Sequence, residues 1–231
     1  MFFDPMYLLF VLPAFLLSAW ASWATRHRFE TWSRVPIQSG ATGESVARYL
    51  LDQNGLSSVR VVPVRGALSD HYDPRERVVR LSEPVYFGRS VSSTAVAAHE
   101  TGHAIQHALG YAPFGLRSLA VPLASLGSNL GMGIIFVGFL LSFTQLVWVG
   151  IVLFAGTVLF QVITLPVELD ASSRAKAELE RLHMVSPDER RGVSAVLTAA
   201  AMTYVGAALS ALSTLAYFVL RAGSMGGRRR A

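Results

Sequence analysis

Three long apolar stretches constrain the fold more than any other feature of this sequence. They cover residues 7–24, 116–165 and 195–220, and 52% of the 231 residues are hydrophobic while only 15% are charged. A helix that crosses a bilayer needs roughly 20 mostly apolar residues. The middle stretch is long enough for two crossings, with a tight hairpin near residues 142–145. The sequence therefore predicts a mainly α protein with a four-helix transmembrane bundle.

The first apolar stretch raises the question of a cleaved signal peptide. Asp4 precedes this stretch, whereas Arg26 and Arg28 follow it directly. A signal peptide carries its positive charge before the apolar region. We therefore expect residues 1–24 to be an uncleaved N-terminal membrane anchor.

The distribution of charge indicates how the chain is oriented in the membrane. The net charge is +5, because 19 Arg and one Lys outnumber 15 Asp and Glu. Of these 20 cations, 16 fall in residues 25–117 and 168–192. The positive-inside rule then predicts that both blocks face the cytoplasm. Four crossings place the basic tail, residues 223–231, on the opposite side, against the same rule. Because the arginines are spread out along the polar segments, no nucleic-acid partner is expected.

Residues 25–115 form the larger polar block, and their patterns predict a small cytoplasmic α+β unit. Residues 42–55 suit a short helix that Thr42 caps and Asn54-Gly55 ends. Residues 59–66 and 77–87 have the β-branched content of strands, and Pro63 and Pro84 favour the edge of a sheet. A helix beginning at the serines near residue 90 and ending at Gly110 completes the unit.

The second polar block, residues 168–194, is predicted to be helical and to lie between two membrane segments. It follows the hairpin of residues 116–167 and leads into the last crossing, residues 195–222. "SPDE" at 186–189 has the pattern of a capping box with proline at the first helical position. One helix can therefore run from this point straight into the last crossing.

The stretch "HETGH", residues 99–103, has the pattern of a metal site. His99 and His103 are four residues apart, so on a helix they project from one face and can bind the same ion. Glu100 lies beside the open coordination position, where a carboxylate can act as general base. The chain has no cysteine, which excludes thiolate ligands. We therefore predict a zinc ion held by this helix.

Such a zinc site needs a third protein ligand. Glu168 is the favoured candidate, because a carboxylate where the third crossing leaves the membrane is costly without a purpose. Asp170 is the competing ligand, and if Glu168 binds the metal, Asp170 or Ser172 could orient a ligand imidazole. His107 lies two helical turns from His99, which is too far for both to bind one ion. His71 and His183 lack a framing motif.

Three segments together resemble a known family. They are "DHYDPRERVVRLSEPVYFGRSVSSTAVAAHETGHAIQHALGY", "LPVELDASSRA" and "AAAMTYVGAALSAL", and they are similar to the YugP-like membrane zinc metallopeptidases of bacteria, whose layout is similar to that of gluzincins such as HtpX. The resemblance implies that His99, His103 and Glu168 bind zinc and that Glu100 is the catalytic base. The residue four after Glu168 is Ser172, where the related gluzincins have aspartate.

The resemblance implies endopeptidase cleavage of a protein or peptide substrate at the inner membrane of a bacterial cell. Glu100 would take a proton from a zinc-activated water and return it to the leaving amine. His71 and Tyr72 are candidate oxyanion donors, and the strand "RVVRLS" could bind an extended substrate by edge pairing. Two alternatives are a non-catalytic membrane scaffold with a structural zinc and an intramembrane site-two-type protease.

Overall fold

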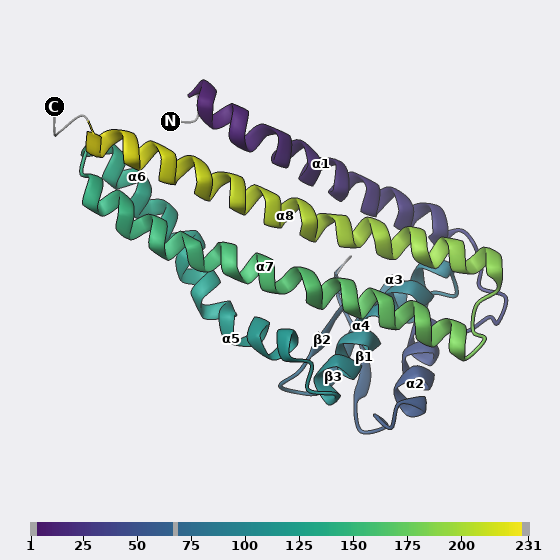
Figure 1. The fold of residues 1–231 in the computed structure, drawn as a ribbon. Helices are drawn as coiled ribbons and strands as arrows, with labels where there is room; N and C mark the ends of the chain where they lie inside the picture. The colour runs from purple at the N-terminus through teal and green to yellow at the C-terminus, as the bar shows by residue number, and fades with distance from the viewer. Residues whose placement is uncertain (1–3, 67–68, 228–231) are drawn as a thin grey trace. The chain divides into compact units, whose positions relative to one another are not determined.

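The structure is a computed structural model that describes residues 4–66 and 69–227 (Figure 1). The chain divides into two compact units. The helical unit comprises Met1–Trp20, Leu116–Pro166 and Thr203–Ala231, and the α+β unit comprises Ala21–Gly115 and Val167–Met202. The last four residues of the predicted basic tail, 228–231, lie outside the described residues.

Four long apolar helices confirm the predicted count of possible membrane crossings. By length and hydropathy they are Pro5–Ser33, Ala112–Leu140, Thr144–Arg181 and Pro187–Met225. In helical elements they correspond to α1 (Pro5–Ser33), α5 (Ala112–Leu126) with the π-helical turn η1 (Gly127–Gly131) and α6 (Met132–Leu140), α7 (Thr144–Arg181), and α8 (Pro187–Gly227). The chain turns between Leu140 and Thr144, where the sequence predicted a hairpin.

Small residues allow close contacts within the helical unit. A Cβ atom added to Gly127 would collide with the carbonyl oxygen of Leu153 on α7. On the other helix pair, the hydroxyl groups of Ser18 on α1 and Ser210 on α8 are 3.1 Å apart. Helices in lipid associate through such small residues because apolar side chains gain little by leaving lipid for each other.

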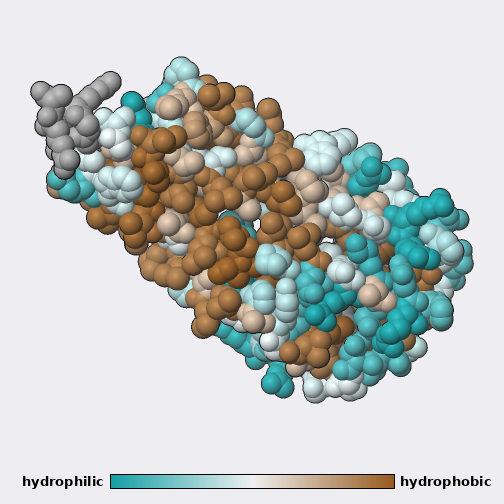
Figure 2. Space-filling model, viewed as in Figure 1, coloured by the Kyte–Doolittle hydropathy of each residue, from teal (hydrophilic) through white to brown (hydrophobic). Residues whose placement is uncertain are grey.

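The outer surface of the helical unit is apolar. Figure 2 shows hydrophobic residues over much of the visible surface of its helices, and Leu9, Leu119 and Val152 are 73%, 77% and 70% exposed. A contiguous apolar surface of this kind is costly in water and matches the interior of a bilayer. The composition of these helices is therefore that of membrane-crossing segments.

The α+β unit is built around a three-stranded sheet. Its own elements are α2 (Gly43–Gln53), β1 (Arg60–Val64), β2 (His71–Asp73), β3 (Val78–Ser82), α3 (Glu83–Tyr86) and α4 (Val91–Ala108). The strand order is β1-β3-β2, with β1 parallel and β2 antiparallel to β3. Alanines 97, 98 and 104 of α4 are buried in a core shared with α2, the sheet, and residues of α7 and α8.

Local capping signals in the sequence match the observed helix ends. The side chain of Thr42 accepts a hydrogen bond from the backbone amide of Ser45 at the start of α2. Ser90 caps α4 in the same way. At the start of α8 the backbone amide of Ser186 donates to the carboxylate of Glu189 at 2.7 Å, as a capping box requires.

Two details of the predicted sheet are wrong. The second predicted strand, residues 77–87, ends at Ser82, and Pro84 lies at the start of the short helix α3 and not in a strand. Proline suits this position because a helix does not use the first N–H groups. The strand "RVVRLS" forms β3, which is central and paired on both sides, so its edges are not available for a substrate strand.

Candidate metal centre

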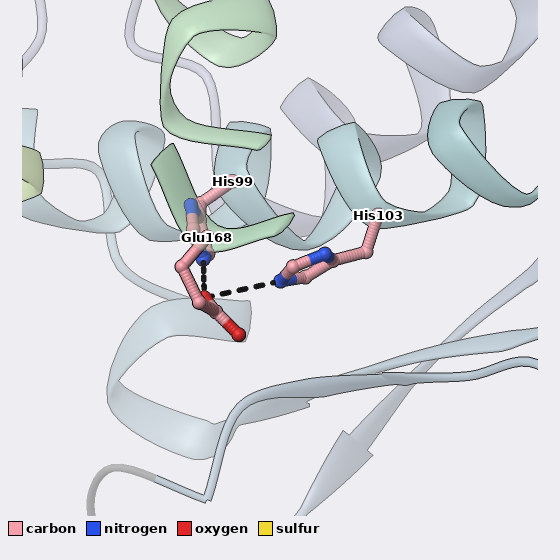
Figure 3. A group of neighbouring side chains, drawn as sticks. All are labelled: His99, His103 and Glu168. Carbon is pink, nitrogen blue, oxygen red and sulfur yellow. Dashed lines mark hydrogen bonds and ion pairs between the residues drawn. The ribbon is translucent and has the colours of Figure 1, made fainter. Parts of the chain in front are cut away.

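Two helices bring the predicted ligands together. His99 and His103 project from one face of α4, and Glu168 approaches them from α7 (Figure 3). Oε2 of Glu168 lies 3.2 Å from Nε2 of His99 and 3.5 Å from Nε2 of His103. Among the described residues, these three side chains form the group whose donor atoms lie close enough together to hold one metal ion.

The spacing of these atoms fits a tetrahedral zinc ion. Zinc binds imidazole nitrogen and carboxylate oxygen at about 2.0–2.2 Å, which places neighbouring ligand atoms of a tetrahedron about 3.3 Å apart. The two observed nitrogen–oxygen distances, 3.2 and 3.5 Å, bracket this value, and all three donor atoms lie within 4.8 Å of one another. Two imidazoles and a carboxylate are also a donor set that zinc prefers. The residues present therefore fit zinc, with a fourth position left for water or substrate.

Close helix packing sets this spacing. Gly102 lies on α4 between the two histidines, and a Cβ atom added there would be 2.7 Å from the backbone oxygen of Ala171 on α7. A contact this short admits no side chain. Glycine at position 102 therefore lets α7 approach α4 closely enough for Glu168 to reach both imidazoles.

Each histidine has a separate partner on its other ring nitrogen. The hydroxyl of Ser172 lies 3.2 Å from Nδ1 of His99. Oε1 of Gln106 lies 2.9 Å from Nδ1 of His103. Such contacts orient a ligand imidazole and select which nitrogen faces the metal. Both Nε2 atoms are thereby directed toward Glu168.

Glu100 is buried next to the ligand set. Burial raises the pKa of its carboxyl to about 7, opposed by the nearby His99 and, more weakly, by the backbone amide of Tyr72. A carboxyl with a pKa near neutrality can both accept and return a proton, as a general acid–base requires. The amide contact also places strand β2 beside this carboxylate.

The remaining candidates lie around this centre in different ways. The hydroxyl of Tyr72 is 2.9 Å from Nδ1 of His107, so these two side chains bind each other. His71 is exposed, and its Nδ1 lies 2.8 Å from the backbone oxygen of Ser69. Asp170 accepts hydrogen bonds from Gln106 and Arg174. His183 is exposed, just beyond the end of α7.

Comparison with known proteins connects this geometry to a family. Residues 7–223 match the family described as "Putative neutral zinc metallopeptidase". The chain belongs to this family. A relative from Bacillus subtilis (strain 168) named "Putative membrane protease YugP" is 47% identical over 215 residues, which cover 93% of this chain and 96% of the relative. No solved structure was found to match the chain.

Membership of the zinc metallopeptidase family confirms the resemblance that the sequence motifs indicated. It also agrees with the donor set of His99, His103 and Glu168, which could hold the metal that the family name implies. Gln106 was not among the residues predicted from the sequence, although it stands three residues after His103 and so on the same face of α4. That spacing was the available signal for it.

Proposed function

We propose that this protein is a membrane-embedded zinc endopeptidase in which Glu100 is the general base. The observation that carries the proposal is the meeting of His99, His103 and Glu168, with the buried carboxyl of Glu100 next to them. Zinc held by these three residues would polarise the scissile carbonyl and lower the pKa of a bound water to about 7. The family and the membrane protease from Bacillus subtilis support the same chemistry.

The residues of the chain divide the work of hydrolysis among them. His99, His103 and Glu168 would hold the metal in place. Glu100 takes a proton from the attacking water and then gives it to the leaving amine, a transfer that contributes about 10²–10⁴-fold to rate when the acid–base group is well positioned. The backbone amide of Tyr72 lies near the Glu100 carboxylate, so strand β2 lies beside the proposed base.

Strand β2 replaces β3 as the proposed substrate-binding strand. β2 lies at the edge of the sheet, and its residue Tyr72 contacts Glu100 through the backbone. An extended peptide that adds to this edge would pass beside the catalytic carboxyl. His71 and Tyr72 on this strand are still candidate oxyanion donors. To donate to an oxyanion, the Tyr72 hydroxyl would have to break its hydrogen bond with His107.

The proposed orientation places the metal centre at the cytoplasmic face. Both ligand-bearing segments fall in the arginine-rich blocks 25–117 and 168–192, which the positive-inside rule assigns to the cytoplasm. In the described part of the chain, four helices are apolar enough to cross a membrane, and α4, which carries the two histidines, is not one of them. This favours a site at the membrane surface over the site-two type of protease, whose metal-binding helix lies within the bilayer.

Glu100→Gln tests the mechanism. The amide cannot act as a base, so we expect full zinc content and at least about a 100-fold loss of cleavage of fluorescein-labelled casein. Glu83→Gln, the same substitution at an exposed position of α3, is the matched control and should cleave at the wild-type rate. Wild-type cleavage by the Glu100 variant would exclude Glu100 as the base. Cleavage absent from all three proteins would favour the scaffold alternative.

Glu168→Ala and Asp170→Ala test the third ligand. Removing a direct ligand should abolish stoichiometric zinc binding, whereas removing Asp170 should leave zinc bound with lower affinity. Zinc content of the purified proteins, measured by elemental analysis after dialysis, distinguishes the two. Loss of zinc from the Asp170 variant with retention in the Glu168 variant would reverse the proposed roles.

A further inference from the structure

Gln106 is a fully buried polar side chain next to the metal centre. It lies on α4, one helical turn after His103, with 0% of its surface exposed. A buried amide is costly unless its hydrogen-bonding groups are satisfied. Its nitrogen donates to the backbone oxygen of Val167 and to Oδ2 of Asp170, each at 2.8 Å. Its oxygen lies 2.9 Å from Nδ1 of His103.

These contacts fix which way the amide is turned. The carbonyl of Val167 and the carboxylate of Asp170 can only accept hydrogen bonds, and Arg174 holds Asp170 at 2.6 Å as an ion pair. The two N–H bonds of the amide must therefore point at Val167 and Asp170. The oxygen that remains can only accept. Nδ1 of His103 must then carry the hydrogen, which leaves the lone pair of Nε2 facing Glu168.

We propose that Gln106 is a positioning residue that fixes His103 as a metal ligand and joins it to the helix that carries Glu168. The inference rests on the proposed zinc site and adds to it. Val167, to which Gln106 binds, directly precedes Glu168 in α7. One side chain therefore sets the tautomer of the ligand on α4 and anchors α4 to the turn of α7 that supplies the carboxylate.

An outer group of residues holds Gln106 in turn. Asp170 accepts from both Gln106 and Arg174, and the guanidinium carbon of Arg174 lies 5.9 Å from the centre of the Tyr111 ring. A series of side-chain contacts therefore runs from Tyr111 through Arg174 and Asp170 to Gln106. This gives Asp170 a role at His103 that is exerted through the amide and needs no direct contact with the metal.

Gln106→Leu removes the acceptor for His103 and both donors with little change of volume. In the purified full-length protein, we expect zinc affinity measured by competition with a chromophoric chelator to fall by about 10–100-fold. Cobalt(II) bound in place of zinc should show weaker visible absorption, because its intensity reports tetrahedral geometry. Gln53→Leu, at an exposed position of α2, is the matched control and should leave affinity and spectrum unchanged.

A second variant keeps the test decisive if Gln106→Leu fails to fold. Gln106→Glu keeps an acceptor for Nδ1 of His103 but replaces both donors with an oxygen that faces the carbonyl of Val167 and the carboxylate of Asp170. At pH 8 we expect this variant to bind zinc at least about 10-fold more weakly than the wild type. A folded protein with either substitution and wild-type zinc affinity would overturn the proposal.

The outcomes also separate this inference from the proposed function. A wild-type protein that binds no zinc would contradict the proposed metal centre itself. A wild-type protein that binds zinc, with affinity that does not depend on position 106, would contradict the positioning role alone. Lower thermal stability of the metal-free variants together with unchanged zinc affinity would show that the contacts of Gln106 serve only the fold.

Discussion

The close contact between α4 and α7 at Gly102 makes a quantitative prediction about the metal centre. Replacing Gly102 with alanine would place a methyl carbon 2.7 Å from the backbone oxygen of Ala171. Carbon and carbonyl oxygen in contact are normally about 3.3–3.6 Å apart. The two helices must therefore separate locally by about 0.6 Å or more, because the backbone fixes the position of the methyl carbon and the oxygen is itself a backbone atom, so neither can rotate away.

This shift is large for a metal centre. Ala171 lies three residues after Glu168, so the displaced turn of α7 is the one that carries the carboxylate. Metal–ligand distances in working sites agree to within about 0.2 Å. A separation about three times this tolerance should weaken zinc binding about 10–100-fold, the range measured for changes that disturb ligand orientation. Overpacking should also destabilise the metal-free fold by about 1–3 kcal/mol.

Chelator competition and thermal unfolding of the metal-free protein measure the two effects. Gly115→Ala is the matched control, because a Cβ atom there meets nothing within 4 Å and position 115 also lies in a helix. Alanine is favoured over glycine in a helix by about 1 kcal/mol, so this control should be neutral or stabilising. A folded Gly102→Ala protein that binds zinc as tightly as the wild type would refute the claim that this contact sets the ligand geometry.

Two further predictions follow from the partners of the ligands and the base. Ser172→Ala removes the group that orients Nδ1 of His99, so zinc affinity measured by chelator competition should fall by about tenfold. This loss should be smaller than that of Glu168→Ala. A loss in Ser172→Ala as large as that of Glu168→Ala would contradict the assignment of Ser172 as an orienting group and not a ligand. The pKa of Glu100 rises from its ordinary 4.5 to about 7 in the folded, metal-free protein, so the folded state binds the proton more tightly and stability falls as pH rises from 4.5 to 7. Thermal unfolding of metal-free protein at pH 5 and pH 8 should show a decrease worth about 3 kcal/mol that Glu100→Gln abolishes.

The sequence predicted features that depend on neighbouring residues. Thr42, Ser90 and the pair Ser186–Glu189 cap helices where their patterns indicated, because a capping hydrogen bond joins residues within one turn. The four apolar helices were predictable for a similar reason, since length and hydropathy are properties of a single segment. The HExxH spacing placed His99 and His103 on one helical face in the same way.

Features that depend on contacts between distant segments were harder to predict. β2 has only three residues in a turn-rich segment, and it is a strand because it pairs with β3. Pro84 lies in the short helix α3, although the segment 77–87 that contains it has the β-branched content typical of a strand. The sequence alone does not decide whether Ser172 or Asp170 orients an imidazole. In the structure, Ser172 lies at His99, and Asp170 is connected to His103 through Gln106. The packing of α4 on α7 decides such details.

The α+β unit is assembled from two parts of the chain, and this has a consequence for biosynthesis. Glu168 is translated 65 residues after His103, beyond the whole of the 116–166 segment. At about 5–20 residues per second, a ribosome needs about 3–13 s to cover that distance. During this interval the nascent chain has the two histidines and Glu100 but lacks Glu168, the proposed third metal ligand. A chain that stalls inside the apolar hairpin is therefore left with an incomplete metal centre.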